Sequence, residues 1–253
     1  MQNVKPSLLL ATSLLSLVAT TSTAAAESKA NPFQGFYGQI STGYESNSFS
    51  NTSTRYTNIS PPEYASNGVN TSTNQTASGV PLILGLGYNF AVTEKWLLGI
   101  GADYSFLSQS SSGFSAKNPA FAQSTPALGQ KIQASNRINV FLTAGYALTQ
   151  RDLIYAKAGY SNQQLQFTRP AQDSATSYSS KSNQGGYILG LGYQRTIEGG
   201  LYLYAEANYM KYSSASLSGS VVTRSDNDTA TTRLNQSPSA SAFTALIGLG
   251  YRF

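Results

Sequence analysis

Two neighbouring stretches decide the fold class: residues 80–90 read VPLILGLGYNF and residues 96–106 read WLLGIGADYSF. In both stretches every second residue is apolar, and most of the residues between them are Gly, Asn, Asp or Ser. Strict alternation of this kind is the pattern of a β-strand with one apolar face. Only residues 91–95 separate the two stretches, which suits a hairpin. The pair therefore predicts two antiparallel strands that share an apolar face.

The same alternation recurs along the rest of the chain, faintly at its start and strongly at its end. The further segments are residues 36–44, 138–148, 153–161, 186–195, 200–210 and 243–253. Together with the first pair they predict eight strands of about ten residues, which is the length that a tilted strand needs to cross a bilayer.

The connections between these strands alternate between short and long. The short ones are residues 91–95, 149–152 and 196–199, and the long polar ones run at about 46–79, 108–137, 166–185 and 212–241. Three tight turns, four long loops and both termini on the tight-turn side are the plan of an outer-membrane barrel. The sequence therefore predicts an all-β fold, an eight-stranded antiparallel up-and-down transmembrane β-barrel.

The composition excludes several classes of function. Only 11% of the 253 residues are charged, against about 25% in soluble domains. The net charge of +5 is thinly spread, so no nucleic-acid partner is expected. Cys and His are both absent, which excludes disulfide scaffolds, Cys/His zinc sites and mechanisms that depend on a thiol or an imidazole. We expect no catalytic residue, no metal and no cofactor.

The first 26 residues are typical of an export signal. Lys5 supplies a positive start, residues 8–18 are apolar, and residues 24–26 are three Ala that suit the small-residue cleavage rule. The apolar stretch is short for a membrane-spanning helix, which needs about 20 residues. We therefore expect residues 1–26 to be a signal peptide and residues 27–253 to form the barrel domain of an exported protein.

In a membrane barrel the apolar set faces lipid and the small or polar set faces the lumen. Aromatic residues at the strand ends predict two interfacial girdles. One girdle would contain Tyr88, Phe90, Trp96, Tyr193, Tyr251 and Phe253, and the other Tyr44, Tyr104, Phe106, Tyr160 and Tyr209.

The inward set holds nearly all the charges found within the strands. These are Asp103, Lys157, Glu206 and Arg252, with Glu45 near one end. Ionisable groups need partners in so narrow an interior, so we expect a hydrogen-bonded ion network. A proton or ion path is one interpretation of this network. The interpretation that we favour is structural, because an eight-stranded interior is just wide enough for side chains to fill it.

At this point the sequence resembles the small outer-membrane β-barrel proteins of Gram-negative bacteria, the group of OmpA-type transmembrane domains, OmpX and opacity proteins. The resemblance rests on the phrase Gly-Leu-Gly-Tyr at 85–88, 190–193 and 248–251 and on the terminal Tyr251-Arg252-Phe253. It implies a place in the bacterial outer membrane, with lipid, lipopolysaccharide and the barrel-assembly machinery as partners. Tyr251 and Phe253 are similar to the family's C-terminal assembly signal.

Three functions remain open from the sequence. The first is a non-enzymatic surface protein that displays four long loops for surface structure, adhesion or binding of a host or surface ligand. The alternative is a small porin-like channel for ions or small solutes, although diffusion pores usually have about 16–18 strands. An enzyme is the least favoured, because no catalytic motif accompanies the many loop serines.

Overall fold

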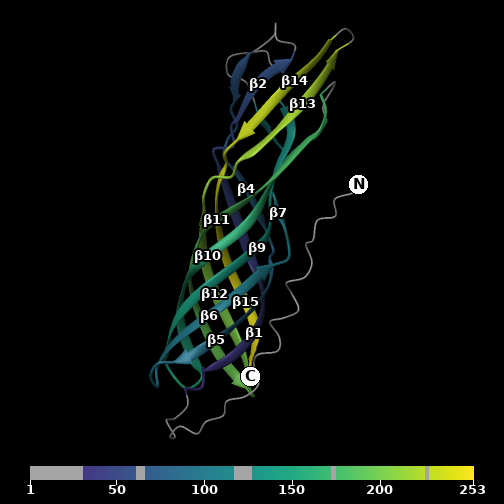
Figure 1. Ribbon diagram of the computed structural model, residues 1–253. Helices are drawn as coiled ribbons and strands as arrows, with labels where there is room; N and C mark the ends of the chain where they lie inside the picture. Colours follow the sequence, from purple (N-terminus) through teal and green to yellow (C-terminus); the bar gives the residue numbers. More distant parts are fainter. Residues whose placement is uncertain (1–30, 61–65, 117–126, 172–174, 226–227) are drawn as a thin grey trace, which may run out of the picture. The chain divides into compact units, whose positions relative to one another are not determined.

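The computed structural model describes residues 31–60, 66–116, 127–171, 175–225 and 228–253 (Figure 1). The expected signal peptide lies outside the described residues. Among the described residues, no helix has the length and apolar content to cross a membrane. The strands are β1 (Gly35–Ser50), β2 (Thr54–Ser60), β3 (Asn67–Asn70), β4 (Gln75–Gly79), β5 (Leu82–Ala91), β6 (Trp96–Ser105), β7 (Gln109–Ser110), β8 (Phe114–Ala116), β9 (Ala127–Ala147), β10 (Asp152–Arg169), β11 (Tyr178–Glu198), β12 (Leu201–Tyr212), β13 (Leu217–Ser225), β14 (Asp228–Gln236) and β15 (Ser239–Arg252).

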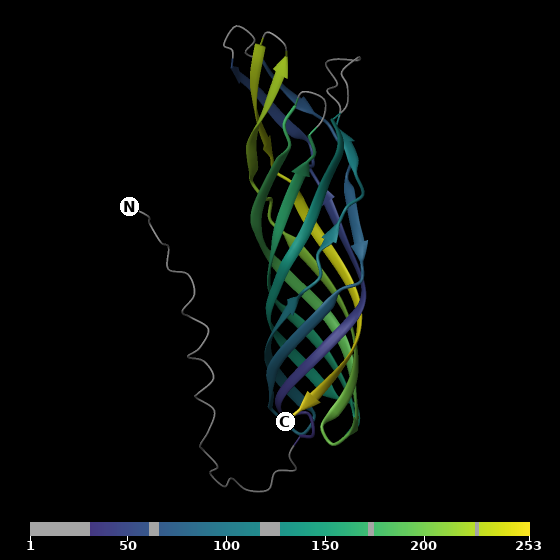
Figure 2. The same ribbon diagram turned by 90° about the vertical axis from the view of Figure 1, so that its right-hand side faces the viewer.

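Eight of these strands form a closed ring. They pair in the order β1, β5, β6, β9, β10, β11, β12 and β15, and β15 pairs again with β1. Every pairing is antiparallel, and each strand pairs with the barrel strands before and after it in the chain. Figure 2 shows them winding around a common axis with a marked tilt. The predicted eight-stranded antiparallel up-and-down barrel is confirmed.

Tight turns gather at the lower end of the barrel in Figures 1 and 2. The Val92 amide donates to the Trp96 carbonyl at 2.9 Å, and the Leu148 amide donates to the Asp152 carbonyl at 2.8 Å. The third turn uses Gly199 and Gly200, whose φ angles of 56° and 86° favour glycine. The predicted short connections are confirmed at all three places.

The predicted strand lengths are wrong for much of the barrel, as is the description of the long connections as loops. β9 and β11 each have 21 residues and β10 has 18. The connections also contain β2, β3, β4, β7, β8, β13 and β14. These segments alternate Ser, Thr, Gln and Asn with few large apolar residues, so their period of two is hard to recognise by hydrophobicity.

The apolar side chains change sides partway up the barrel. In the lower half, up to about Asn136 on β9 and Gln163 on β10, most of them face outward: Leu84 is 45% exposed and Leu142 is 64% exposed. A small inward cluster that includes Leu97 and Leu153 lies near the tight turns. In the upper half, beyond that level, they face inward: Leu165 and Phe167 are buried, while Gln166 and Thr168 face outward.

The change of side on β9 has a local backbone cause. Before Asn136 in the chain the buried residues have even numbers, Ile132 and Ala134. After Asn136 they have odd numbers, Arg137 and Asn139. Asn136 has a φ of 50°, and the pairing of β9 with β10 shifts register at the same level. This is the signature of a β-bulge, which inserts one extra residue and so exchanges the odd and even faces of the strand.

The upper half has an apolar core of its own. Phe49, Ile132, Leu165 and Phe167 are at most 1% exposed and belong to one buried cluster that draws on most of the barrel strands. Beyond this core a second sheet forms from the first and last long connections, in the order β13, β14, β2, β3. Figure 1 shows β2, β13 and β14 at the upper end of the molecule.

Candidate functional site

The centre of the lower lumen is a lysine held between two carboxylates. Lys157 Nζ lies 2.9 Å from Asp103 Oδ2 and 2.9 Å from Glu206 Oε1. The three side chains come from β10, β6 and β12, and each is at most 6% exposed. Lys157 Nζ also lies 3.9 Å from the centre of the Phe141 ring. The lysine therefore joins strands on different sides of the barrel through charge.

Each carboxylate of this cluster has further hydrogen-bond donors. Asn139 Nδ2 donates to Asp103 Oδ1 at 2.5 Å. The Tyr155 hydroxyl donates to Glu206 Oε2 at 2.8 Å, and Asn208 Nδ2 donates to Glu206 Oε1 at 2.8 Å. Buried charges are tolerated when they are paired and hydrogen-bonded in this way. All four carboxylate oxygens are engaged, which disfavours them as ligands for a metal or as general bases.

The structure brings together three of the four expected residues and places Arg252 elsewhere. Arg252 Nη1 donates to the Pro32 carbonyl at 2.6 Å, and its guanidinium lies 5.1 Å from the Phe33 ring centre. The separation follows from register, because Glu206 is paired with Leu246, six positions before Arg252 on β15. Six residues of strand span about 20 Å. Arg252 therefore lies at the lower end of the lumen, and not in the lysine cluster.

A second ion pair lies higher in the lumen, and of its two residues only Glu45 is among those predicted from the sequence. Arg137 Nη1 lies 2.8 Å from Glu45 Oε2. Arg137 Nη2 donates to Asn47 Oδ1 at 2.7 Å and to Gln163 Oε1 at 3.0 Å. The available signal was that Arg137 has the inward phase of Asn139 and immediately precedes the predicted strand at 138–148.

Tyrosine rings fill the lumen below the lysine cluster by packing on glycines. A Cβ atom added to Gly192 would lie 2.1 Å from Cζ of Tyr155, and one added to Gly250 would lie 2.1 Å from Cζ of Tyr202. The inward glycines thus provide the space that these rings occupy. One cavity among these side chains has a volume of about 30 Å³. Such a volume holds one or two waters.

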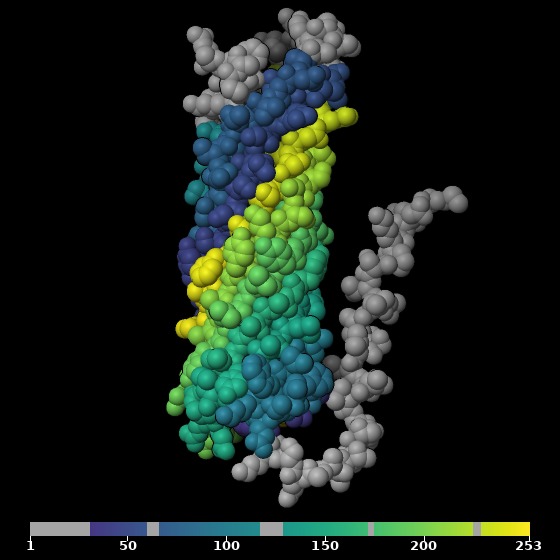
Figure 3. All heavy atoms as spheres, turned by 90° about the vertical axis from the view of Figure 1, so that its left-hand side faces the viewer, coloured from purple at the N-terminus to yellow at the C-terminus, as the bar shows by residue number. Residues whose placement is uncertain are grey.

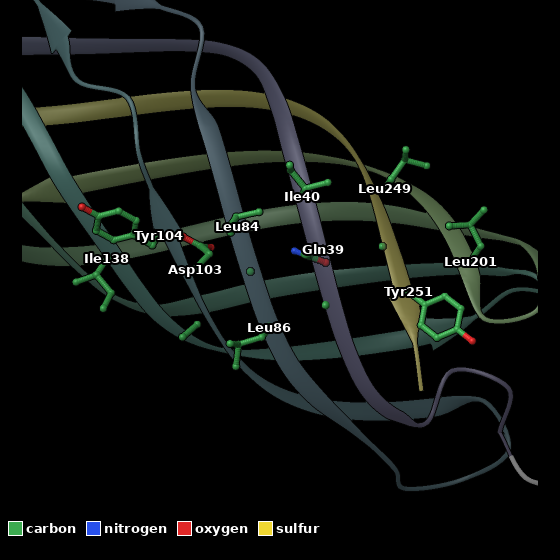
Figure 4. A pocket seen from close by; sticks show the side chains of 14 residues that line it. Gln39, Ile40, Leu84, Leu86, Asp103, Tyr104, Ile138, Leu201, Leu249 and Tyr251 are labelled. Atoms are coloured by element: carbon green, nitrogen blue, oxygen red, sulfur yellow. The ribbon is translucent and has the colours of Figure 1, made fainter. Parts of the chain in front are cut away.

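The outer surface of the lower half is apolar and ends in aromatic rings. One shallow groove on it has a volume of about 790 Å³. Figure 4 shows Ile40, Leu84 and Leu249 among the residues that line it. Tyr251 is 47% exposed and Phe253 is 81% exposed, and their ring centres lie 5.1 Å apart. Both residues of the expected assembly signal therefore lie on the outer surface at the lower rim.

The two predicted girdles can be followed on this surface. In the upper girdle the Tyr104 hydroxyl donates to Asn136 Oδ1 at 3.0 Å, and Tyr160 is 55% exposed. In the lower girdle Trp96 is 53% exposed and its ring packs at 5.0 Å on the ring of Tyr146. Figure 3 shows β1, β15 and β12 as tilted purple, yellow and green bands across one face, without a break between them.

Comparisons with known proteins agree with this geometry. The model of a family described as outer membrane protein beta-barrel domain matches residues 11–253. Among solved structures, OprG from Pseudomonas aeruginosa is similar at a TM-score of 0.50 and 14% identity, over 87% of this chain and 97% of that one. Among curated proteins no significant sequence match is found.

Two further solved structures are similar at lower scores. Ail, the attachment invasion locus protein of Yersinia pestis, gives a TM-score of 0.39 at 14% identity, over 87% of this chain and 99% of that one. The outer membrane protease OmpT from Escherichia coli gives 0.49 at 11% identity, over 90% of this chain and 99% of that one.

Proposed function

Because this chain belongs to the outer membrane protein β-barrel domain family, and so lies in the bacterial outer membrane, we propose that it is a non-enzymatic surface protein that binds partners at its upper end. In such barrels the short turns face the periplasm and the long connections face outward. The lower half then spans the membrane between the two aromatic girdles, and the upper half with its second sheet is extracellular.

One observation carries this proposal: the upper half is a folded structure with a core of its own. Spanning the bilayer needs strands of about ten residues, and the lower half supplies them. The extension of β9, β10 and β11, the buried Phe49 and Phe167 and the four-stranded second sheet serve no purpose in the membrane. A rigid extracellular end supports a role in presenting a binding surface.

The lumen supports a binding role over a channel. Lys157 with its two carboxylates and Arg137 with Glu45 occupy the lower half, and the apolar core occupies the upper half. A cavity of only about 30 Å³ lies in the lower lumen, lined by Tyr37, Tyr155 and Glu206 among others. In this proposal the lumen ion network is structural. The engaged, buried carboxylates likewise support a protein that is not an enzyme.

Assembly completes the proposal. Residues 1–26 direct export, and the barrel-assembly machinery recognises the last strand through the exposed Tyr251 and Phe253. Lipid and lipopolysaccharide surround the lower half, in contact with Leu84, Leu142 and the other outward apolar residues. The extracellular end is left free to meet a host or surface ligand.

The test compares pore activity with surface binding. Residues 27–253 are refolded, a heat-shift gel confirms the folded barrel, and conductance is recorded in planar bilayers. Cells that produce the protein and cells that lack it are then compared for binding to extracellular proteins and glycans. A silent barrel together with increased binding by the producing cells is expected. Discrete, reproducible channels, or equal binding by both kinds of cell, would overturn the proposal.

A further inference from the structure

The mature chain's positive charge is concentrated at its extracellular end. In the lower lumen, Glu45, Asp103 and Glu206 are matched in number by Arg137, Lys157 and Arg252. The three periplasmic turns, taken with the adjacent Arg195, also carry three acidic and three basic residues. The four long segments (50–81, 106–136, 162–187 and 211–241) contain eight Lys or Arg residues against four Asp or Glu residues. The excess of positive charge is therefore on the outside of the cell.

Three of these basic residues share one face of the second sheet. Arg55 on β2 is paired with Asn235, and Arg233 on the adjacent β14 is paired with Thr57. The two arginines are thus diagonal neighbours on one face, a relation that places Cβ atoms about 7–8 Å apart. Ser220 on β13 is paired with Arg233 and therefore shares its face. Arg224 is four residues after Ser220 on the same strand, and an even separation keeps it on that face. All three arginines are exposed. We call this surface the arginine face.

The opposite face of the sheet is buried, which fixes the arginine face as the outer one. Val221 is 2% exposed and Leu234 is 5% exposed. The ring of Tyr178, from β11, packs so closely on Gly219 that a Cβ atom there would lie 1.9 Å from Cε2 of Tyr178. The sheet is therefore anchored on the barrel through its apolar side. Its arginines project from a backbone that is already ordered, so less entropy is lost when a ligand binds.

The arginine face also differs from the lumen in how its charges are compensated. Among the described residues, the ion pairs lie in the lumen and at the periplasmic turn of Asp152 and Arg195. On the arginine face the cross-strand partners of the three arginines within β2, β13 and β14 are the neutral hydrogen-bonding residues Thr57, Ser220, Thr229 and Asn235. The acidic residues nearest to the arginines in the chain are Asp226 and Asp228, after Arg224. Guanidinium groups bind sulfate and phosphate oxygens in a bidentate manner. The face therefore presents donors suited to an anionic polymer.

We propose that the arginine face binds a polyanionic glycan, one that carries sulfate or phosphate groups along its length. This inference rests on the proposed surface-binding function and names the ligand class. The glycan is a soluble or host-surface polymer, and not the headgroup layer of the protein's own membrane, because Arg233 lies ten residues before Phe243 of β15. These ten residues are extended except at the break between β14 and β15, and ten extended residues span up to about 33 Å. Headgroup phosphates lie near the upper girdle, at the level of Lys211.

The test measures binding of the full mature chain in detergent to an immobilised sulfated polysaccharide, heparin, at several salt concentrations. The triple variant Arg55→Gln, Arg224→Gln, Arg233→Gln is compared with the matched variant Lys131→Gln, Lys181→Gln, Lys211→Gln, which removes the same charge from the barrel wall. We expect the arginine variant to lose at least tenfold in affinity and to show a smaller salt slope, and the lysine variant to stay within about threefold. A heat-shift gel confirms that both variants are folded.

A third variant separates geometry from charge. The triple change of these arginines to Lys keeps the charge and loses the bidentate fork, so we expect a loss of several-fold with the salt slope retained. Equal losses in the arginine-to-Gln and lysine-to-Gln variants would overturn the inference, as would tighter binding to single-stranded DNA or to anionic lipid vesicles than to heparin. If heparin does not bind but producing cells still gain a partner, the inference fails while the proposed function stands.

Discussion

Strand β10 runs through both halves of the molecule, and its two halves are built on opposite plans. In the lower half Ile154 and Tyr160 face outward while Lys157 faces the lumen. In the upper half Leu165 and Phe167 face inward while Gln166 faces outward. The backbone pairing is the same in both halves, since β10 stays hydrogen-bonded to β9 and β11 along its length. In the proposed placement the surrounding solvent, lipid below and water above, decides which face carries the apolar side chains.

The comparison also shows two ways of filling the same narrow lumen. The lower half presents most of its apolar side chains outward, so its interior is filled mainly by ion pairs, amides and tyrosines, with a small apolar cluster of Phe33, Leu97, Ala147 and Leu153 near the tight turns. The upper half can bury its apolar side chains, and its interior is a conventional hydrophobic core. The two interiors therefore differ in what a substitution removes, a charge partner below and packed volume above.

The largest effect is expected from breaking the lower interior. Lys157→Met leaves the buried Asp103 and Glu206 without their cation, and removal of one partner of a buried pair destabilises by about 3–5 kcal/mol. The control is Lys131→Met, an exposed lysine of the upper half, for which a change within about 0.5 kcal/mol is expected. The measurement is the urea midpoint in lipid vesicles. Equal midpoints for the two variants would show that the lysine cluster does not stabilise the barrel.

A packing defect in the upper interior comes next. Phe167 is 1% exposed and lies among Phe114 and Tyr178, so Phe167→Ala should destabilise the upper half by about 3 kcal/mol. Amide hydrogen exchange should accelerate in β9 and β10 above Gln163 and stay unchanged around Lys157. Acceleration spread evenly over both halves would mean that they do not behave as separate cores.

A charge on the outer surface distinguishes the two halves directly. Leu142 is 64% exposed, midway along the lower half of β9, so Leu142→Arg places a charge in lipid and should destabilise by about 2 kcal/mol or more. Gln166→Arg on the outer face of the upper half should change stability by less than about 0.5 kcal/mol. The difference is measured as urea midpoints in vesicles, and a reversed order of the two variants would contradict the assigned membrane boundary.

The smallest effect is expected at the periplasmic turn. Asp152 accepts hydrogen bonds from the hydroxyls of Thr149 and Tyr193 and lies 3.1 Å from Arg195 Nη1, and these contacts, chiefly that of Thr149, lower its pKa. A carboxylate with a lowered pKa stabilises the fold above its unfolded pKa, and the stabilisation is lost as pH falls through the folded pKa. Asp152→Asn should therefore lower the unfolding midpoint slightly at pH 7 and not at pH 2. The same difference at both pH values would contradict this linkage.

The sequence predicts the lower half better than the upper half for a physical reason. Lipid requires long outward runs of Leu, Ile and aromatic residues, and these make the alternation visible at 80–90 and 96–106. The strands of the upper half need only an occasional inward Leu165 or Phe167 among polar residues, so the sequence pattern predicts loops there. In the same way Asp103, Lys157 and Glu206 share a predictable phase within the predicted strands, whereas Arg137 lies just before the predicted strand at 138–148, next to the bulge at Asn136.

The change of side on β10 can be measured residue by residue. The chain contains no Cys, so single Cys residues from Ile154 to Thr168 can each carry a fluorophore in vesicles of brominated lipid. We predict lipid quenching at 154, 156, 158 and 160, quenching by aqueous iodide at 164, 166 and 168, and protection from both at 165 and 167. Lipid quenching that continues unchanged through 166 and 168 would contradict the account, because the upper half would then be a second stretch of membrane barrel.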